Sequence, residues 1–405
     1  MNISDSERVA AVLEKLGYKK ATKMSSADLV IVNMCSVRQS AVDRVLGLIK
    51  KIRPLKIRKP LLQTMATGCF LTKDISKLSK IFDHILPINE IGKLGKILKK
   101  SKLISKDYLN ITPAYENKFS AIIPIMTGCN NFCAYCVVPY TRGRETSRPA
   151  KQIISEIKKL IKRGYKEIWL MGQNVNSYKD KNIDFPDLLE KIDAVPGKFW
   201  IRFTSSHPKN FSNKLITVMA KGDKITPYLN LPVQAGSNNV LEKMNRPYSI
   251  SQYKKMIEKV RSKIPNITIS TDIIVGFPSE TKRDFDESLK LFQNIKYDMA
   301  YISEYSPRAG TSASEMDDNV PKTEKANRKF LLNEILKKTA QEKNNVYLGR
   351  EVEALISERK DKKSFVGKTR EYKTIWLTSG KNIVGKFIKA KIENASPWGL
   401  RGKLL

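Results

Sequence analysis

Three cysteines lie close together in one short segment, at Cys129, Cys133 and Cys136, with the spacing C-x3-C-x2-C. The segment follows directly after an apolar run at residues 121–126. Three thiolates at this spacing can hold three irons of a cubic 4Fe–4S cluster and leave the fourth iron free to bind another molecule. Structural iron–sulfur sites normally use four cysteines, so the missing fourth ligand predicts a cluster that takes part in chemistry.

The other two cysteines each follow a short apolar run. Cys35 comes after residues 29–32 and Cys69 after residues 61–65, and both runs are expected to form strands. Ligands of parallel α/β proteins bind outside the carboxyl ends of the strands, where Cys35, Cys69 and Cys129 are all expected. We therefore predict that Cys35 and Cys69 have a functional role rather than a packing role. Taken singly, each could instead be a small buried apolar residue, the usual role of a lone cysteine.

Zinc is the main alternative metal for the three clustered cysteines. A zinc site needs a fourth ligand, usually histidine or cysteine. The chain has two histidines, His84 and His207, and His207 follows an expected strand. Zinc fingers usually bring ligand pairs together from separate segments, whereas three cysteines share one loop here, so an iron–sulfur cluster is favoured.

Lysine and arginine number 74 against 40 acidic residues, which gives the 405-residue chain a net charge of +34. Such a charge favours a polyanionic partner, nucleic acid first, although a general enrichment in lysine would give the same composition. Five cysteines in so long a chain do not form a disulfide framework. No apolar stretch approaches the roughly 20 residues of a membrane span, and the amino terminus does not resemble a signal peptide. We therefore expect a cytoplasmic protein without membrane association.

Helix-like and strand-like segments alternate over residues 1–105. Apolar residues recur on one face of residues 5–16, and residues 39–51 are also expected to be helical. Continuous apolar strands between helices are typical of a parallel sheet covered on both faces. The sequence therefore predicts an amino-terminal parallel α/β domain, followed by a Lys-rich connector at residues 93–110.

The alternation continues more clearly over residues 115–343. Helices are expected at residues 150–162 and 281–293, where apolar side chains recur at helical spacing, and a Lys/Glu-rich helix at residues 323–343. Six strand–helix units in roughly 200 residues predict a partial (β/α)6 barrel. Its strands are expected at residues 121–126, 167–171, 199–204, 228–232, 268–275 and 298–303.

The pattern changes over residues 346–405. Strand-like segments at residues 352–356, 374–377 and 383–391 are interspersed with glycines, which is typical of a small β-barrel. The fold class expected for the whole chain is therefore α/β, with a parallel amino-terminal domain, a partial central barrel and a small carboxyl-terminal β-barrel.

At the cysteine loop the sequence resembles the radical S-adenosylmethionine (SAM) enzymes, whose signature is C-x3-C-x2-C with an aromatic residue, here Tyr135, before the last cysteine. The longer run from Gly128 to Glu145 is more specific and resembles the methylthiotransferase family, most closely its tRNA-modifying branch. Further motifs extend the resemblance over nearly the whole chain: Asn33-Met-Cys-Ser-Val-Arg38, Thr67-Gly-Cys69, Met171-Gly-Gln-Asn-Val-Asn176, Phe203-Thr-Ser-Ser-His-Pro208, Leu231-Pro-Val-Gln-Ala-Gly-Ser237, Asp272-Ile-Ile-Val-Gly-Phe-Pro278 and Tyr305-Ser-Pro-Arg308.

The resemblance implies three domains: an amino-terminal cluster domain, a radical SAM barrel and a carboxyl-terminal RNA-binding barrel called TRAM. It implies two 4Fe–4S clusters, with Cys129, Cys133 and Cys136 on the reducing one and Cys35 and Cys69 on the other. SAM would bind at the open iron of the reducing cluster. The residues that the resemblance places near SAM are Tyr135, Gly172, Gln173, Asn174 and Gly276, although Gly172 and Gly276 are equally well explained as turn glycines.

The implied reaction is methylthiolation of carbon 2 of N6-isopentenyladenosine beside the tRNA anticodon. Reductive cleavage of SAM would give a 5′-deoxyadenosyl radical, which would abstract hydrogen from a C–H bond that no side-chain base activates. The cofactors carry this step and the protein positions them, while the second cluster would supply or carry the sulfur. The implied partners are tRNA and an electron donor such as flavodoxin or ferredoxin, and we expect a monomer.

The amino terminus departs from the family pattern, which has three cysteines in this domain. The first of them lies in a Gly-Cys-Gln-Met-Asn stretch, whereas this chain begins at Met1-Asn2, with Asp5-Ser6 following as in the family. We expect the natural start to lie upstream and to supply that cysteine. The alternative is that only Cys35 and Cys69 hold the second cluster, which would put transfer activity in doubt.

The predicted RNA contacts rest on charge and position. Arg142 and Arg144 lie beside the cysteine loop and could grip a phosphate, or could belong to a solvated basic loop. In the terminal barrel, aromatic residues could stack on bases while cations meet phosphates, although Trp376 fits a core position. The residues concerned in that barrel are Lys368, Arg370, Tyr372, Lys373, Trp376 and Trp398.

Two other functions stay open. One is a sister methylthiotransferase that acts on threonylcarbamoyladenosine in tRNA or on a ribosomal protein, although the residues at 130–132 and 137–140 favour the isopentenyladenosine enzyme. The other is a non-catalytic RNA-binding protein stabilised by zinc. Colour separates the two classes, because an iron–sulfur enzyme is brown and a zinc protein is colourless.

Overall fold

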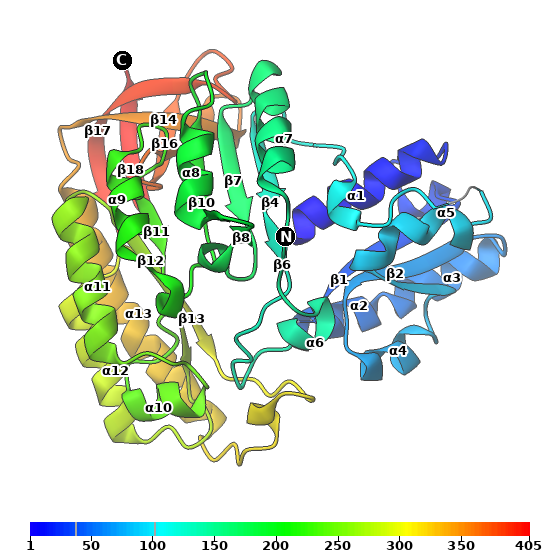
Figure 1. The fold of residues 1–405 in the computed structure, drawn as a ribbon, viewed down its shortest axis with the longest axis horizontal. Coiled ribbons are helices and arrows are strands. Elements are labelled where there is room, and N and C mark those ends of the chain that lie inside the picture. The colour runs from blue at the N-terminus through cyan, green and yellow to red at the C-terminus, as the bar shows by residue number, and fades with distance from the viewer. Residues whose placement is uncertain (37–38, 101–102) are drawn as a thin grey trace. The chain divides into compact units, whose positions relative to one another are not determined.

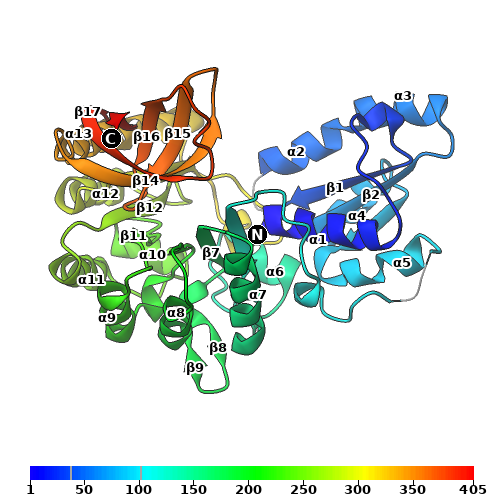
Figure 2. The same cartoon turned by 90° about the horizontal axis from the view of Figure 1, so that it is seen from above.

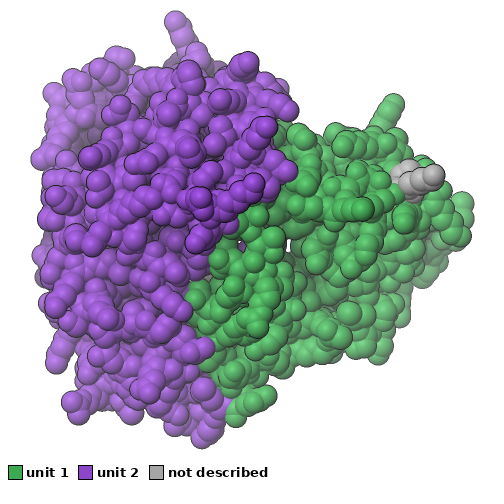
Figure 3. Space-filling view, viewed as in Figure 1, with its two compact units in different colours: residues 1–117, 122–148, 306–315 green, residues 118–121, 149–305, 316–405 purple. Residues whose placement is uncertain are grey.

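The computed structural model describes residues 1–36, 39–100 and 103–405. By its internal contacts the chain divides into two units, coloured separately in Figure 3. Unit 1 comprises residues 1–117, 122–148 and 306–315, and unit 2 comprises residues 118–121, 149–305 and 316–405. The predicted cysteine loop therefore belongs with the amino-terminal residues rather than with the remainder of the central segment.

Unit 1 is built on a parallel sheet in the order β1-β2-β3. Strand β1 (Leu29–Cys35) pairs with β2 (Gln63–Cys69), and β2 pairs with β3 (His84–Pro87), which was not expected. The prediction that Cys35 and Cys69 lie beyond their strands is wrong, because both strands extend further toward the carboxyl end than expected. Backbone pairing continues to the cysteines, so they are the last residues of their strands.

Helices cover both faces of this sheet (Figure 2). Met65 packs in a core with α1, and the next residue, Ala66, packs in a second core with α2, because successive strand side chains point to opposite faces. The helix expected at residues 39–51 is in fact two helices, and glycine, a poor helix former, ends the first. The helices are α1 (Asn2–Lys15), α2 (Gln39–Gly47), α3 (Ile49–Arg58), α4 (Thr72–Leu78) and α5 (Leu94–Ile97).

The segment expected to be a connector, residues 93–110, is structured in its described part. It contains α5 and a 3-10 turn at Tyr108–Asn110, and Leu94, Leu98 and Tyr108 are buried in the same core as α1. The segment is therefore amphipathic, although its many lysines made it look like an exposed connector. Two motif residues, Val37 and Arg38, and part of this connector, residues 101–102, lie outside the described residues.

The strand expected at residues 121–126 is interrupted at Pro124, which lacks the N–H that a continuous ladder needs. Strand β4 (Ser120–Pro124) ends there, and β5 (Met126–Thr127) instead pairs antiparallel with β6 (Thr146–Ser147). Helix α6 (Val138–Arg142) lies between β5 and β6 in the chain. The β5–β6 pair thus closes the base of the loop that carries three cysteines.

Six strands of the central segment form two three-stranded sheets, β10-β7-β4 and β11-β12-β13. The pairs β10–β7, β11–β12 and β12–β13 are parallel. A parallel bridge between Ile201 and Ile225 links the end of one sheet to the segment before the other. These six strands confirm the predicted partial barrel. Their bounds are β7 (Glu167–Met171), β10 (Trp200–Phe203), β11 (Tyr228–Asn230), β12 (Thr268–Val275) and β13 (Met299–Glu304), with β4 as above.

Helices alternate with these strands and lie along their outer side (Figure 1). Helix α12 begins after Thr281, whose hydroxyl accepts a hydrogen bond from Asp284 N in a capping box. A short hairpin, β8 (Lys179–Asp180) and β9 (Ile183–Asp184), precedes α8. The helices are α7 (Ala150–Lys162), α8 (Phe185–Asp193), α9 (Asn213–Lys221), α10 (Asn238–Lys243), α11 (Ile250–Lys263), α12 (Lys282–Ile295) and α13 (Lys322–Asn345).

The carboxyl-terminal residues close into the predicted β-barrel, in the order β14-β15-β16-β18-β17. Gly385, with a φ of +73°, turns the chain before β17, so the strand expected from residue 383 begins at Phe387. Two of the strands were not expected from the sequence, β15 and β18. The bounds are β14 (Glu351–Arg359), β15 (Ser364–Thr369), β16 (Thr374–Thr378), β17 (Phe387–Ser396) and β18 (Gly399–Leu404).

A buried arginine fastens this terminal barrel to the central one. The side chain of Arg202 is fully buried and donates to Glu167 Oε1 at 2.7 Å, to Thr226 Oγ1 at 3.0 Å, and to the carbonyls of Arg370 at 3.0 Å and Thr369 at 2.9 Å. Because Glu167 is the first residue of β7, the terminal barrel packs at the amino end of this strand.

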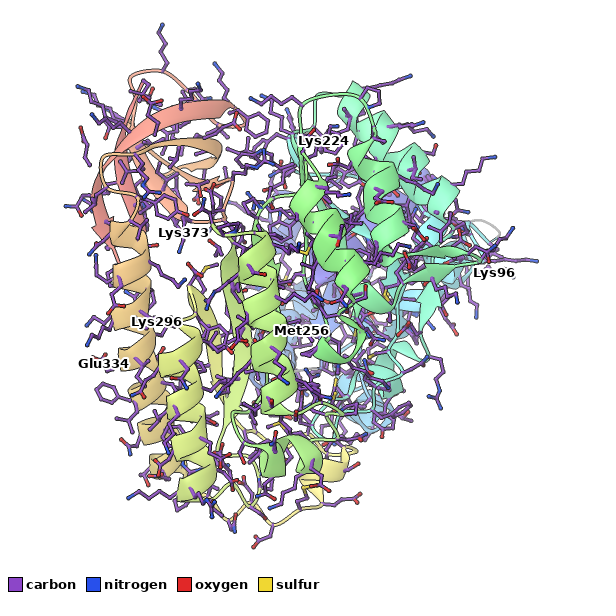
Figure 4. All side chains as sticks on the ribbon, turned by 60° about the vertical axis from the view of Figure 1, so that its left-hand side comes forward. Lys96, Lys224, Met256, Lys296, Glu334 and Lys373 are labelled. Atoms are coloured by element: carbon purple, nitrogen blue, oxygen red, sulfur yellow. The ribbon has the colours of Figure 1, made fainter. Side chains whose placement is uncertain are left out.

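A second ion pair fastens the same two parts. Lys373, labelled in Figure 4, comes from the turn between β15 and β16 and pairs with Asp298 at 2.6 Å, with both side chains 5% exposed. Asp298 immediately precedes β13.

No helix among the described residues is both long and apolar enough to cross a lipid bilayer.

Candidate functional site

The three clustered cysteines are partly exposed and form no disulfide within the described residues. Their loop is closed by main-chain hydrogen bonds, from Cys129 N to the Gly143 carbonyl at 3.2 Å and from Cys136 N to the Cys133 carbonyl at 2.9 Å. All three thiols therefore belong to a single turn of chain anchored at its ends. This is the donor set that a cluster with one open iron requires, and the residues present fit it.

Backbone constraints shape the loop on both sides of Cys129. Gly128 has a φ of +77°, and a Cβ there would lie 2.1 Å from the Arg144 carbonyl oxygen, so only glycine fits. Phe132 adopts a φ of +40°, which is uncommon for an aromatic residue. Its ring packs edge-on against Tyr140 and under the Arg144 guanidinium. Strained residues of this kind cluster at functional sites.

The pKa of the Cys129 thiol is shifted by two opposing effects. Burial raises its pKa, and Asn131, whose Nδ2 lies 3.5 Å from the Cys129 sulfur, acts in the opposite direction by stabilising the thiolate. Metal binding requires the thiolate, so iron must displace a proton here. The amide donor next to the sulfur lowers the cost of that displacement.

Cys35 and Cys69 lie opposite each other at the ends of β1 and β2, as register partners. Cys69 is buried, and burial raises the pKa of its thiol to about 11, partly offset by the nearby guanidinium of Arg142. The preceding Gly68 has a φ of +111°, and a Cβ there would lie 2.2 Å from the Met34 carbonyl oxygen. Close approach of the two strands thus depends on glycine, and it places Cys35 and Cys69 side by side at the strand ends.

Arg142 lies inside unit 1 rather than on a basic surface. Its side chain is 4% exposed and pairs at 2.5 Å with Asp5, which is fully buried, and it donates to the Tyr108 hydroxyl at 3.3 Å. A guanidinium held in this way is not available to an RNA phosphate, and the expectation that Arg142 grips RNA is corrected accordingly. The sequence does not identify Asp5 as the partner of Arg142, because no local pattern indicates a contact 137 positions away.

Four of the residues predicted near SAM directly follow strands of the central barrel. Gly172, Gln173 and Asn174 directly follow β7, and Gly276 directly follows β12. Gly276 has a φ of +66°, its N–H donates to Glu280 Oε2 at 2.5 Å, and a Cβ there would meet the Lys325 side chain. All four therefore lie at the carboxyl edge of the strands in unit 2, where α/β barrels bind their ligands. Tyr135 lies in unit 1, beside Cys136.

The three basic residues of the terminal barrel that were predicted to contact RNA, Lys368, Arg370 and Lys373, are partly or fully buried. Lys373 is in its buried pair with Asp298, and Arg370 donates to the Ile225 carbonyl at 3.5 Å. Burial, followed by the charge of Arg202, lowers the pKa of Lys368 to about 8. Tyr372 packs edge-on against Trp169 and at a tilted angle against Tyr228, both of the central barrel. These contacts argue against the predicted RNA roles of Lys368, Arg370, Tyr372 and Lys373.

Two of the predicted RNA-binding residues stay accessible. Arg144 is exposed beside the cysteine loop, and Trp398 is 59% exposed at the tip between β17 and β18. Trp376, which was expected to fit a core position, is only partly buried. The accessible candidates for RNA contact are therefore fewer than the sequence suggested.

His207, the proposed fourth ligand of a zinc site, is buried and already holds a structural hydrogen bond. Its Nδ1 accepts from Lys209 N at 3.1 Å and caps a 3-10 turn. Within residues 1–36, 39–100 and 103–405, no three or more His, Cys, Asp or Glu side chains are gathered in the way a single metal ion requires. This holds for Cys129, Cys133 and Cys136 as well, so it does not distinguish zinc from an iron–sulfur cluster.

Three family models match consecutive parts of the chain. Residues 1–87 match "Uncharacterized protein family UPF0004", residues 123–292 match "Radical SAM superfamily", and residues 345–405 match "TRAM domain". The radical SAM match contains all three clustered cysteines, and the first match contains Cys35 and Cys69. The three matches follow the same order as the α/β sheet, the partial barrel and the closed β-barrel.

Curated relatives resemble the chain over its whole length. A protein of Thermoanaerobacter sp. (strain X514) is 40% identical over 427 residues, which cover 100% of this chain and 90% of the relative. A protein of Dictyoglomus thermophilum is 40% identical over 423 residues, covering 100% and 96%. Both relatives are named tRNA-2-methylthio-N(6)-dimethylallyladenosine synthase.

Solved structures share the fold at low sequence identity. The cobalamin-dependent radical SAM enzyme OxsB matches with a TM-score of 0.54 and 13% identity, over 82% of this chain and 53% of that one. The radical SAM methyltransferase TsrM from Kitasatospora setae matches with a TM-score of 0.53 and 14% identity, over 76% and 66%. These likenesses establish the architecture and carry no further conclusion about chemistry.

Proposed function

The chain belongs to the radical SAM methylthiotransferases that modify tRNA, and we propose that it methylthiolates carbon 2 of N6-isopentenyladenosine next to the anticodon. The observation that supports this most strongly is the 40% identity to dimethylallyladenosine synthases across the entire chain, at 90% or more of the relatives' length. Membership of the family implies a 4Fe–4S cluster and SAM.

We assign the reducing cluster to Cys129, Cys133 and Cys136. When bound, this cluster supplies the electron that cleaves SAM and so makes radical chemistry available at an unreactive C–H bond. The protein's part is to hold three thiolates in one anchored loop, to leave one iron open and to position the cosubstrate. The Asn131 amide beside the Cys129 sulfur and the constrained Gly128 support that holding role.

We assign a second 4Fe–4S cluster, the source or carrier of the sulfur, to Cys35 and Cys69. Its support is the pairing of these two free cysteines at adjacent strand ends. Arg142 approaches the Cys69 sulfur closely enough to stabilise a thiolate, which favours metal binding there. The residues proposed to contact SAM are Tyr135, Gly172, Gln173, Asn174 and Gly276.

We propose the following division of the chain: a cluster domain at residues 1–105, a radical SAM domain at 115–343 and a TRAM domain at 346–405. The TRAM domain and the exposed Arg144 are the proposed contacts with the tRNA backbone. A flavodoxin or ferredoxin is the proposed electron donor. The protein is proposed to act as a monomer in the cytoplasm, where its five cysteines stay reduced.

Nucleoside analysis of tRNA tests the substrate assignment. Cells that lack the gene should lose the 2-methylthio mark and accumulate N6-isopentenyladenosine, and the intact gene should restore the mark. A Cys133→Ala gene should not restore it, although the protein should still be made. Loss of a threonylcarbamoyladenosine derivative instead, or unchanged tRNA with an altered ribosomal protein, would assign the chain to a sister enzyme.

Anaerobic spectroscopy tests the cofactor assignment independently. Purified protein should be brown, absorb broadly in the visible range and cleave SAM when reduced. A colourless protein that carries zinc would overturn both enzymatic assignments at once.

A further inference from the structure

Two neighbouring loops of unit 2 hold an unusual set of buried polar atoms. Among the described residues, no hydrogen-bond partner is found for Gln173 Oε1, Asn174 Oδ1, Ser206 Oγ or His207 Nε2. The first two follow β7 and the other two follow β10. Native proteins leave few buried polar atoms unsatisfied, and each needs an explanation. Four in two adjacent loops at a ligand-binding edge indicate a ligand that completes them.

The two loops are tied to each other, so these atoms are held in place. Asn176 grips the backbone of His207 from both sides: its Nδ2 donates to the His207 carbonyl, and its Oδ1 accepts from His207 N, each at 2.8 Å. Val175 N donates to the Ser205 carbonyl at 3.2 Å. Ser205 itself has a φ of +66°, an uncommon conformation that sets the direction of the following residues. A rigid pair of loops is the form expected of a prearranged binding site.

The hydrogen-bond pattern of His207 fixes which nitrogen carries the proton. Nδ1 accepts from Lys209 N, so in the neutral ring Nε2 carries the hydrogen and is a donor. Burial, and after it the charges of Arg246 and Lys209, lower the pKa of this imidazole to about 3. The ring is 5% exposed and packs edge-on against Tyr248. His207 therefore presents a neutral, fixed N–H donor rather than an acid or a base.

The four unsatisfied atoms are complementary in kind. His207 Nε2–H and the Ser206 hydroxyl can donate, whereas Gln173 Oε1 and Asn174 Oδ1 can only accept. A zwitterionic ligand has both a carboxylate, which accepts, and an ammonium, which donates, and SAM carries both groups. Gln173 and Asn174 are already proposed SAM contacts, and Asn176 joins their loop to that of His207.

We propose that His207 Nε2 donates a hydrogen bond to an acceptor oxygen of bound SAM, with Ser206 beside it, so that the loop after β10 forms part of the SAM site. This inference rests on the proposed function. It adds the end of strand β10, whose motif at residues 203–208 had no assigned role beyond a zinc ligand at His207. The role is binding and orientation of the cosubstrate, and no proton is transferred.

Two substitutions test the roles of the two ring nitrogens separately. His207→Asn retains an acceptor near the Nδ1 position, where asparagine is a good helix cap, but removes the donor at Nε2. His207→Gln places an amide nitrogen near the Nε2 position and removes the cap. Each is made in the full-length, anaerobically reconstituted protein. Equilibrium dialysis then measures the dissociation constant of radiolabelled SAM, and filter binding measures that of tRNA, with iron content determined in parallel.

We expect His207→Asn to weaken SAM binding about fivefold to tenfold, the value of one hydrogen bond, with iron content and tRNA affinity unchanged. His207→Gln should stay within about threefold of the unsubstituted protein. Unchanged SAM affinity in His207→Asn would overturn the proposal, as would equal losses in both variants or a loss confined to tRNA. SAM cleavage of the wild-type protein is unaffected by these outcomes, so the proposed function is tested separately.

A measurement on the unsubstituted holoenzyme guards against variants that fail to fold. SAM should slow backbone hydrogen exchange in residues 203–210, because the ligand satisfies buried donors there and suppresses local opening. Exchange in this segment that ignores saturating SAM would also overturn the proposal.

Discussion

Replacing Arg202 tests how the central barrel holds the TRAM domain. This side chain is fully buried and donates to Glu167, Thr226 and the carbonyls of Thr369 and Arg370, at 2.7 to 3.0 Å. Arg202→Met removes the charged partner of the Glu167 carboxylate, which is 12% exposed and also accepts from the Ser120 hydroxyl at 2.8 Å. Breaking a buried ion pair from one side costs about 3–5 kcal/mol.

Arg202→Lys distinguishes the contribution of the positive charge from that of the guanidinium hydrogen bonds. A lysine keeps the positive charge near Glu167 but cannot reach four acceptors with one compact ammonium. Loss of up to three hydrogen bonds at about 1 kcal/mol each predicts a cost of about 2–3 kcal/mol. The ordering expected for stability is therefore wild type, then Arg202→Lys, then Arg202→Met.

The assay is urea unfolding followed by tryptophan fluorescence. The rings of Trp169 and Trp200 lie 5.8 Å and 5.0 Å from the Arg202 guanidinium carbon, so their emission reports on this interface. Arg283→Met, at an exposed position of α12, is the matched control and should change stability by less than about 0.5 kcal/mol. A loss below about 1 kcal/mol in Arg202→Met would refute the reasoning, and wild-type stability in Arg202→Lys would refute the role given to geometry.

Three further predictions concern the rest of the molecule. Arg142→Met should cost about 3–5 kcal/mol because it strands the fully buried Asp5, whereas the exposed Arg144→Met should change thermal stability little; equal small effects would contradict the burial of Arg142. Cys133→Ala should abolish reductive SAM cleavage in an anaerobic assay while the affinity for tRNA stays within a factor of two or so; retained cleavage would remove Cys133 from the cluster. The imidazole of His207 has a pKa of about 3 when folded against a usual value of 6.5, so the unfolded chain takes up a proton that the folded chain refuses. Stability should therefore fall by about 2 kcal/mol from this group as the pH drops from 7 to 5, and His207→Asn should lose that part of the pH dependence in urea unfolding.

The sequence alone determined whatever depends on local spacing. Helix α7 and strands β7 and β12 have the bounds that periodicity predicted, because the period of apolar residues directly records which face is buried. The spacing of the three clustered cysteines likewise indicated the kind of cluster before any fold was known, since ligands within one loop need no long-range contact to come together.

Tertiary structure decided everything that depends on distant partners. Cys35 and Cys69 become neighbours only through the register of β1 and β2. Arg142 and Lys373 carry the same charge in sequence as any surface cation, but Asp5 and Asp298 hold them inside. The sequence shows how many cationic side chains there are but not which of them pair with an anion. Whether a given side chain is buried is decided only when the chain folds. The same long-range packing ties Asn176 to His207 and turns a motif of unassigned purpose into a candidate binding edge.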